Sequence, residues 1–320
     1  MTPPLVALVT CKEARHLDED LPLLESAIRN RGGSVEIVEW RDAHVDWSAF
    51  DLAVVRSTWD YFCDLDGFLA WAERVDSATC LVNPLPALRW SADKRYLAEL
   101  DAQGVPTVPT RFVAPGSAAA IGSDEDVVVK PAVAAGSTDA LRFRAGDAAA
   151  AIKHAHEITS SGRVALIQPY QRAVDDRGET GLLFAGGEFS HAFCKAAILT
   201  GDDVAFVEGL YAAEDISPRV PTSAEHAIAK AALAAAPSES ELAYARVDLI
   251  PGPAGEPLVL EVELVEPSLF LATDPASADR FARAIIDRMN ASIESLAPTP
   301  VASPGGRVQG VGPGRRSGPP

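Results

Sequence analysis

The sequence lacks the features that mark secreted, membrane-spanning and disulfide-stabilised proteins. Its four cysteines include no CxxC pair, so we expect buried free thiols and a reducing compartment. No apolar run approaches the roughly 20 residues that a membrane span needs. The N-terminus, Met1-Thr-Pro-Pro, has neither a basic region nor a small-residue cleavage site. We therefore expect a cytoplasmic protein without a membrane partner.

Positive charge is also scarce. The chain holds 28 lysines and arginines against 45 aspartates and glutamates, which gives a formal net charge of −17. Such a surface repels phosphate backbones and anionic membranes at long range, so nucleic acid is excluded as an expected partner. ATP remains an admissible ligand, because a few placed lysines and a metal ion decide the field inside a site.

Apolar residues, in contrast, make up 48% of the chain, enough for two or three packed domains. The N-terminal part alternates short apolar strands with amphipathic helices, which indicates a parallel sheet covered on both faces. The first strand is followed by Thr10-Cys11-Lys12-Glu13 rather than G-x-G-x-x-G, which excludes a Rossmann dinucleotide domain. We expect strands at 5–9, 35–38, 52–55 and 80–82, and helices at 17–28 and 68–75.

Beyond a domain junction at 83–86, the pattern predicts mixed α/β structure. Ser91 is expected to cap a helix that runs to about residue 103. Short glycine turns between the later strands favour antiparallel pairing. We expect strands at 127–129, 164–168, 181–184, 190–194, 243–250 and 258–262, and helices at 147–160, 223–236 and 276–293. The Pro- and Gly-rich tail is expected to be disordered.

A lysine at the end of one predicted strand precedes a loop of small residues, in Val127-Val-Val-Lys130-Pro-Ala-Val-Ala-Ala-Gly136-Ser137. Small side chains let backbone N–H groups approach a phosphate, and the lysine adds a positive charge beside it. No G-K-[ST] follows, so this is not a Walker A loop. The segment is a candidate phosphate-binding loop, and an ordinary flexible loop is the alternative.

Carboxylates gather on two later strands. Alternate side chains of a strand share a face, so Glu261 and Glu263 point the same way. If the two strands form a hairpin, Asp248 lies on that face as well. Three carboxylates in an apolar sheet repel one another unless a cation neutralises them, and oxygen ligands suit Mg²⁺. The sequence therefore predicts a Mg²⁺ site, with the solvated polar face of an edge strand as the alternative.

In their order and spacing, these segments resemble the ATP-grasp superfamily, which includes glutathione synthetase and D-alanine–D-alanine ligase. The resemblance covers about 83–293, with a matching βαβ domain in front. It implies an α/β and α+β fold, in which an N-terminal parallel βαβ (pre-ATP-grasp) domain precedes a two-lobed ATP-grasp domain. The implied limits are 1–84 for the N-terminal substrate-side domain, 85–168 for a small central lobe that bears the lid, 169–297 for the C-terminal lobe with the metal site, and 298–320 for the disordered tail.

The resemblance implies ATP and Mg²⁺ as cofactors and indicates how ATP is held. Lys94 and Lys130 match the two lysines that contact the nucleotide. Gly136 and Ser137 match the small-residue loop that closes over the phosphates. These residues are therefore expected at the phosphate end of the nucleotide.

Further matches concern the adenosine end and the reacting phosphate. The segment Gln168-Pro169-Tyr170 matches the hinge strand that reads the adenine edge, and Glu179 resembles the acidic residue near the ribose. Lys195 resembles the basic residue that contacts the terminal phosphate. We expect Lys195 and Arg246 to stabilise charge on the transferring group.

The metal ligands of the family are matched with one departure. Asp248 and Glu261 match two of them, but Glu263 stands where the family usually has asparagine. A carboxylate there either adds a third ligand to Mg²⁺ or faces a cationic amine of the substrate. The sequence leaves both interpretations open.

A narrower resemblance comes from three segments, 55–61, 90–97 and 260–271. They read VRSTWDY, WSADKRYL and LEVELVEPSLFL. These segments are similar to the ATP-grasp subgroup that includes the cyclo-ligase closing O-ureido-D-serine to D-cycloserine. That subgroup also has members of unknown substrate, so the match implies a chemistry better than it names a metabolite.

Four residues of these segments are candidates for substrate binding. Arg56 and Ser57 end a strand at the carboxyl end of a parallel sheet, where α/β folds bind ligands. A guanidinium there can grip a substrate carboxylate bidentately, and an arginine on the surface is the alternative. Glu266 and Ser268 follow the metal strand and are candidates to hold a substrate amine.

We therefore expect an ADP-forming ligase that activates a small amino-acid-like carboxylate as an acyl phosphate and forms an amide or a ring. An O-ureido-D-serine cyclo-ligase of D-cycloserine biosynthesis is the specific candidate. Three alternatives stay open: a ligase that modifies a peptide or protein, a kinase on the same scaffold, and a non-catalytic nucleotide sensor. The expected partners are a small-molecule carboxylate and amine; the oligomeric state stays open, a homodimer included.

Overall fold

The computed structural model describes residues 3–199, 206–207, 211–212, 214–238, 241–296 and 318. It confirms the predicted fold class, because a parallel N-terminal sheet is followed by antiparallel sheets. The disorder predicted for the tail falls on residues that, apart from 318, lie outside the described ranges. Among the helices of the described ranges, none combines the length and apolar character needed to cross a membrane.

The N-terminal domain is built on a parallel sheet in the order β2-β1-β3-β4. Strand β1 lies inside this sheet and is apolar on both faces, because helices cover both faces. Val6 packs with Leu24 on one face, whereas Ala7 packs with Phe68 on the other. The elements are β1 (Leu5–Thr10), α1 (Asp20–Asn30), β2 (Ser34–Glu39), β3 (Leu52–Ser57), α2 (Leu65–Ala78) and β4 (Cys80–Val82), with short 3-10 helices at Ala14–His16, Trp47–Ala49 and Tyr61–Asp64.

A small lobe follows, with an antiparallel sheet in the order β5-β8-β6-β7. One helix packs on it, where Val129 contacts the apolar face that Ala151 and Ala155 present. The two outer strands, each of three residues, were not predicted, because so short a segment carries no clear alternation. The elements are β5 (Arg111–Val113), β6 (Val127–Pro131), β7 (Leu141–Phe143), α5 (Ala148–Ser160) and β8 (Ala165–Pro169).

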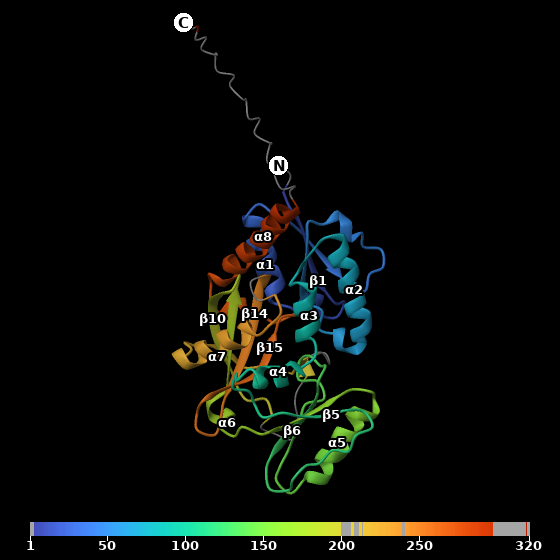
Figure 1. Ribbon diagram of the computed structural model, residues 1–320, viewed down its shortest axis with the longest axis vertical. Coiled ribbons are helices and arrows are strands. Elements are labelled where there is room, and N and C mark those ends of the chain that lie inside the picture. The colour runs from blue at the N-terminus through green and yellow to red at the C-terminus, as the bar shows by residue number, and fades with distance from the viewer. Residues whose placement is uncertain are drawn as a thin grey trace.

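The C-terminal lobe has an antiparallel sheet in the order β13-β10-β9-β14-β15. Figure 1 shows α8 with α1 at one end of the molecule and the small lobe with β6 and α5 at the other. The elements are α6 (Val174–Arg177), β9 (Glu179–Ala185), β10 (Glu188–Lys195), β13 (Ile216–Pro218), α7 (Ser223–Ala234), β14 (Tyr244–Pro251), β15 (Pro257–Glu263) and α8 (Ser277–Leu296), with a two-stranded pair β11 (Phe206–Val207) and β12 (Tyr211–Ala212) and a 3-10 helix at Leu271–Thr273.

The segment between the first two domains differs from the prediction. Two short helices, α3 (Leu85–Ser91) and α4 (Tyr96–Ala102), replace the single helix. Ser91 does not cap a helix: its hydroxyl donates to Val262 O at 2.8 Å and accepts from the Leu264 N–H at 2.9 Å. Leu97 packs in the same core as Val247. This segment packs on the C-terminal sheet and is also joined to the small lobe, because the Lys94 N–H donates to Ala132 O at 2.9 Å.

Buried polar side chains join the N-terminal domain to the C-terminal sheet. The Asn83 amide donates to the carbonyls of Tyr244 and Leu264, at 2.8 Å each, and its oxygen accepts the Ala243 N–H at 2.9 Å. The Asp20 carboxylate accepts three consecutive backbone N–H groups, those of residues 269–271. These contacts hold the carboxyl ends of the parallel strands against the segment that follows β15.

The thiols are free, as predicted, but only one of them is buried. Cys11 is buried, Cys80 and Cys194 are half-buried, and Cys63 is exposed. The apolar neighbourhood of Cys63 in the sequence misleads, because that residue lies in a short 3-10 helix at the surface.

Candidate active site

A cavity of about 660 Å³ opens where the three sheets meet. The N-terminal domain, the small lobe and the C-terminal lobe all contribute to its lining. Of the residues predicted to form the site, all line this cavity except Arg56 and Ser57. Side chains predicted from separate parts of the sequence are thus brought to one place.

The charged wall of the cavity is the antiparallel hairpin of β14 and β15. Asp248 lies opposite Glu261, and Arg246 lies opposite Glu263. Side chains of paired residues project from the same face of a sheet, here the face that lines the cavity. Val247 alternates with them and packs in the apolar core behind. Because Asp248 is buried and both glutamates are half-buried, the alternative of a solvated edge-strand face does not hold.

Arg246 links two of the carboxylates. Its Nε donates to both oxygens of Asp248, at 3.0 and 3.1 Å, and Nη2 donates to Asp248 Oδ2 at 3.0 Å and to Glu263. Nη1 donates to Ser268 O at 3.0 Å. Burial lowers the pKa of Arg246, but the two carboxylates outweigh it and the pKa lies well above its usual value. The guanidinium is therefore a fixed positive charge beside the carboxylates.

Two lysines face the same carboxylates from the other elements. Lys94 Nζ lies 2.9 Å from Glu261 Oε1 and donates to Ala134 O at 2.8 Å. Burial raises the pKa of Glu261, but Lys94 and Lys130 outweigh it and the pKa is lowered. The Lys130 side chain forms no hydrogen bond or ion pair with any residue in the described ranges, and burial lowers its pKa. Unlike Lys94, which is paired with Glu261, Lys130 therefore has its Nζ available to bind a phosphate.

Lys195 ends β10 between two carboxylates. Its Nζ lies 2.8 Å from Glu179 and 3.5 Å from Glu214. Burial lowers the pKa of Lys195, but these carboxylates outweigh it and the pKa is raised. Lys195 therefore stays protonated in the cavity. Glu179, which was predicted near the ribose, is an ion-pair partner of this lysine.

The hinge between the lobes is held by polar contacts. The Gln168 amide donates to Thr110 Oγ1 at 2.9 Å, and the Tyr170 N–H donates to Asp126 O at 2.8 Å. The guanidinium of Arg142 lies 3.5 Å from the centre of the Tyr170 ring, a cation–π contact. The hinge segment Gln168-Pro169-Tyr170 thus enters the cavity in a defined conformation.

The small-residue loop after β6 has an unusual backbone. Gly136 and Ser137 have φ values of 58° and 63°, in the left-handed region. Glycine adopts this region freely, whereas a serine there is strained. Asp139 pairs with Arg163 at 2.7 Å and so ties the loop to the residues before β8. Because such strain clusters at ligand clamps and switches, the loop conformation supports a functional interpretation.

Arg56 is placed differently from the expectation that it grips a substrate carboxylate. Its side chain is 1% exposed, and Nη2 donates to Pro267 O at 2.7 Å. The guanidinium also lies 5.2 Å from the centre of the Tyr244 ring. The Ser57 hydroxyl is bonded to that of Thr10 at 2.8 Å. Arg56 thus lies in the interface with the C-terminal lobe, which covers the end of β3, whereas the Ser57 hydroxyl is bonded within the N-terminal domain.

The sequence analysis missed all the cavity residues of the N-terminal domain, Asp18, Trp59 and Tyr61 among them. Asp18 lies after β1, and Trp59 and Tyr61 lie after β3. Asp18 is 7% exposed, and burial raises its pKa while Arg56 opposes the rise. The signal was available, because ligands of open α/β sheets bind beyond the carboxyl ends of the strands. The prediction named Arg56 and Ser57 at the end of β3, whereas the cavity residues lie in the loops that follow β1 and β3.

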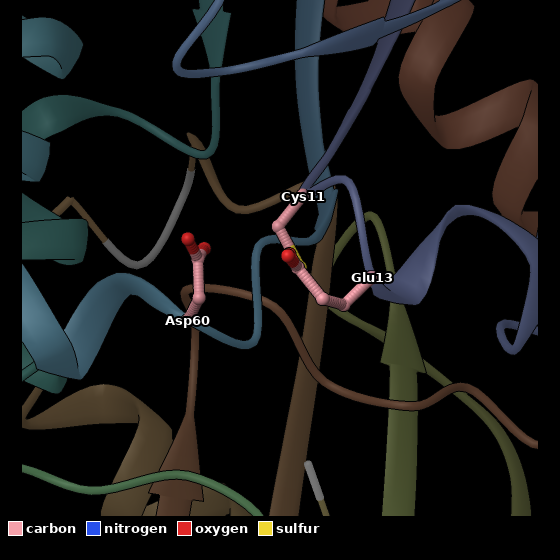
Figure 2. A group of neighbouring side chains, drawn as sticks. All are labelled: Cys11, Glu13 and Asp60. Carbon is pink, nitrogen blue, oxygen red and sulfur yellow. The ribbon is translucent and has the colours of Figure 1, made fainter. Parts of the chain in front are cut away.

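A second group of potential metal ligands lies outside the cavity. Figure 2 shows Cys11 and Glu13 from the loop after β1, and Asp60 from the loop after β3, with their ligand atoms within 4.8 Å of one another. The Asp60 oxygens already accept from Trp40 Nε1 at 2.7 Å and Arg41 Nε at 2.8 Å. Burial raises the pKa of the Cys11 thiol to about 11, which disfavours the thiolate that a metal requires. We interpret this group as structural.

The half-buried Glu263 makes a testable contribution to stability. Burial raises its pKa from 4.5 to about 7, although Arg246 opposes the rise. Between these pH values the folded chain holds a proton that the unfolded chain has lost, so this residue lowers stability as pH rises through that window. We expect Glu263→Gln to remove that loss without metal present. Melting temperatures of both proteins from pH 4.5 to pH 8, in buffer with chelator, test this; parallel curves would contradict it.

Comparison with known proteins gives concordant matches. The family model described as the N-terminal domain of D-cycloserine synthetase DcsG matches residues 6–83. Over 298 residues the chain is 40% identical to the cycloserine biosynthesis protein DcsG of Streptomyces lavendulae, which covers 89% of this chain and 99% of that protein. The crystal structure of D-cycloserine synthetase DcsG matches with a TM-score of 0.80 and 37% identity, over 89% of this chain and 99% of that chain.

A more distant match concerns the fold alone. D-alanine–D-alanine ligase from Bacillus anthracis, in complex with ATP, matches with a TM-score of 0.63 at 12% identity, over 92% of this chain and 100% of that chain. At this identity the match says nothing about substrate.

Proposed function

The chain belongs to the DcsG family of ATP-grasp ligases, and from this premise we propose that it closes O-ureido-D-serine to D-cycloserine, using ATP and Mg²⁺. The relatives at 40% and 37% identity are named for cycloserine biosynthesis and D-cycloserine synthesis. A cytoplasmic location, where ATP is available, is part of the same proposal.

The observation that carries the proposal is the charge arrangement of the cavity. Carboxylates of Asp248, Glu261 and Glu263 project from one face of the hairpin, and lysines surround them. Oxygen ligands on a rigid sheet fit Mg²⁺, which binds through one or two carboxylates together with substrate phosphates. When bound there, Mg²⁺ would neutralise charge on the β and γ phosphates. A sensor of nucleotides has no need of three carboxylates in so costly a position.

The protein's own residues then have distinct tasks in the first step. Lys94 and Lys130 hold the phosphates under the Gly136 loop. A carboxylate oxygen of the substrate attacks the γ phosphorus, ADP leaves, and an acyl phosphate forms. Lys195 and Arg246 stabilise the charge that spreads over the transferring group. Closing of the strained loop excludes water, which would hydrolyse the acyl phosphate.

Ring closure completes the reaction. The nitrogen bonded to oxygen in the ureido group attacks the acyl carbon, loses its proton, and displaces phosphate with its bonding electron pair. D-Cycloserine lacks the carbamoyl group of O-ureido-D-serine, so that group must also leave, by hydrolysis to carbon dioxide and ammonia. The proposal therefore names four products besides the ring: ADP, phosphate, carbon dioxide and ammonia.

The direct test is ADP and phosphate release by purified protein with Mg·ATP, against a panel of amino acids that includes O-ureido-D-serine. We expect release with this substrate, formation of D-cycloserine detected by mass spectrometry, and loss of both when a chelator removes Mg²⁺. Hydroxylamine should trap the activated carboxylate as a hydroxamate. A phosphorylated product stable to hydroxylamine would point to a kinase, and ATP binding without ADP release across the panel would contradict the proposal.

A further inference from the structure

Two polar side chains that line the cavity, Glu266 and Tyr61, take no part in its ion pairs between described residues. Within the described ranges, the Glu266 carboxylate and the Tyr61 phenol form no hydrogen bond or ion pair, although they are 8% and 3% exposed. Glu261 is paired with Lys94, and Glu263 with Arg246. Both side chains line the cavity, so their polar atoms are available to a ligand there instead of to a protein partner.

The two groups reach the cavity from different domains. Tyr61 begins the 3-10 helix Tyr61–Asp64 after β3, whereas Glu266 follows β15 by three residues. Both side chains line the same cavity, one from the N-terminal domain and the other from the C-terminal lobe, and we call these two residues the Tyr61–Glu266 corner. Burial raises the pKa of Tyr61 well above its usual value, and the Glu266 carboxylate adds to the rise.

Holding Glu266 there is unfavourable for the protein alone. Burial, followed by repulsion from Glu263, raises the pKa of Glu266 well above its usual value. Folding by itself would favour a neutral or apolar residue at this position. A ligand that brings N–H donors would supply the missing hydrogen bonds. The carboxylate can accept from an ammonium or a ureido N–H, and the phenol can accept from an N–H or donate to a carbonyl.

We propose that Glu266 and Tyr61 together form the subsite that binds a nitrogen-bearing end of the amino-acid substrate, and that Tyr61 is a specificity-determining residue. This inference rests on the proposed function of the same cavity. The lysines and Arg246 serve phosphates and the activated carboxylate, while the Tyr61–Glu266 corner selects substrates that carry N–H donors. It holds that end of the substrate while the carboxylate is activated.

Two variants test the corner. We expect Glu266→Gln, which keeps the shape, to raise KM for O-ureido-D-serine about 10- to 100-fold, because a charge-assisted hydrogen bond is lost. Tyr61→Phe should raise it roughly 2- to 10-fold, the effect of one neutral hydrogen bond. KM for ATP should stay within about twofold of wild type in both variants. Because Glu266 is unpaired, its replacement by glutamine should leave the melting temperature unchanged or higher.

Analogues then identify which nitrogen is bound. One analogue lacks the α-amino group, and the other carries a methyl group in place of the ureido group; each is assayed for ADP release with hydroxylamine as the trap. If the corner binds a given group, Glu266→Gln loses its effect with the analogue that lacks that group. Loss of the effect with either analogue supports the inference and names the nitrogen. An undiminished effect with both overturns it.

A matched control separates recognition from packing. Tyr244 is also a buried tyrosine, but its hydroxyl contacts the carbonyls of Val55, Val82 and Val265. We expect Tyr244→Phe to lower the melting temperature and to leave KM for O-ureido-D-serine unchanged. If wild type turns over no substrate, the proposed function fails. If wild type is active and both corner variants keep its KM, this inference alone fails.

Discussion

Glu261→Gln lowers kcat for ADP release by about 100- to 1000-fold, the loss typical of removing one group that stabilises transition-state charge. Glutamine keeps the shape of the side chain but removes one negative charge of the proposed Mg²⁺ site, beside Asp248, its cross-strand neighbour. It also leaves Lys94 without the carboxylate that lies 2.9 Å away. Steady-state ADP release over a range of Mg²⁺ concentrations measures the effect, and the variant should need more metal for half-maximal rate.

Glu256 supplies the control for this prediction. It lies in the turn of the same hairpin and is exposed, and among the described residues its carboxylate accepts only the Ala254 N–H, at 2.8 Å. Glu256→Gln should therefore show wild-type kcat and the wild-type dependence on Mg²⁺. A Glu261→Gln variant that matches this control would refute the metal site on β15.

We expect Arg246→Met to lower both the stability of the protein and its activity. It leaves Asp248 and Glu263 buried without their cation, and breaking a buried ion pair in this way costs about 3–5 kcal/mol. We also expect ADP release to fall about 100-fold or more, because a guanidinium beside the transferring phosphate is lost. Urea unfolding with and without Mg²⁺ measures the loss in the free energy of unfolding. We expect Mg²⁺ to restore part of this free energy, because bound Mg²⁺ would neutralise the same carboxylates.

Arg246→Lys and Arg288→Met complete this experiment. Lysine restores a charge but not the forked hydrogen bonds to Asp248, so it should recover stability more than activity. Arg288 lies 3.7 Å from Glu241 in a partly exposed pair, and its replacement by methionine should change stability by less than about 1 kcal/mol. If Arg246→Met were as stable and active as Arg288→Met, the assigned role of Arg246 would be wrong.

Local patterns in the sequence were enough to predict the β14–β15 hairpin and its charged face. Alternation along a strand is a property of the backbone, so Glu261 and Glu263 had to share a face wherever the strand was placed. Strands and helices with clear periodicity appear close to their predicted bounds, as at β14 and α5. The candidate residues on these elements, such as Lys130 and Lys195, line the cavity for the same reason.

Only the tertiary structure decided which residues of the N-terminal domain face the cavity. Arg56 was the sequence candidate, yet docking of the C-terminal lobe buries it against Pro267 and Tyr244, while Tyr61 reaches the cavity. Ser91 likewise bonds to β15 instead of capping a helix. The periodicity that determined each strand face is local, whereas these outcomes depend on contacts between residues about 170 to 210 positions apart, which no pattern along one segment records.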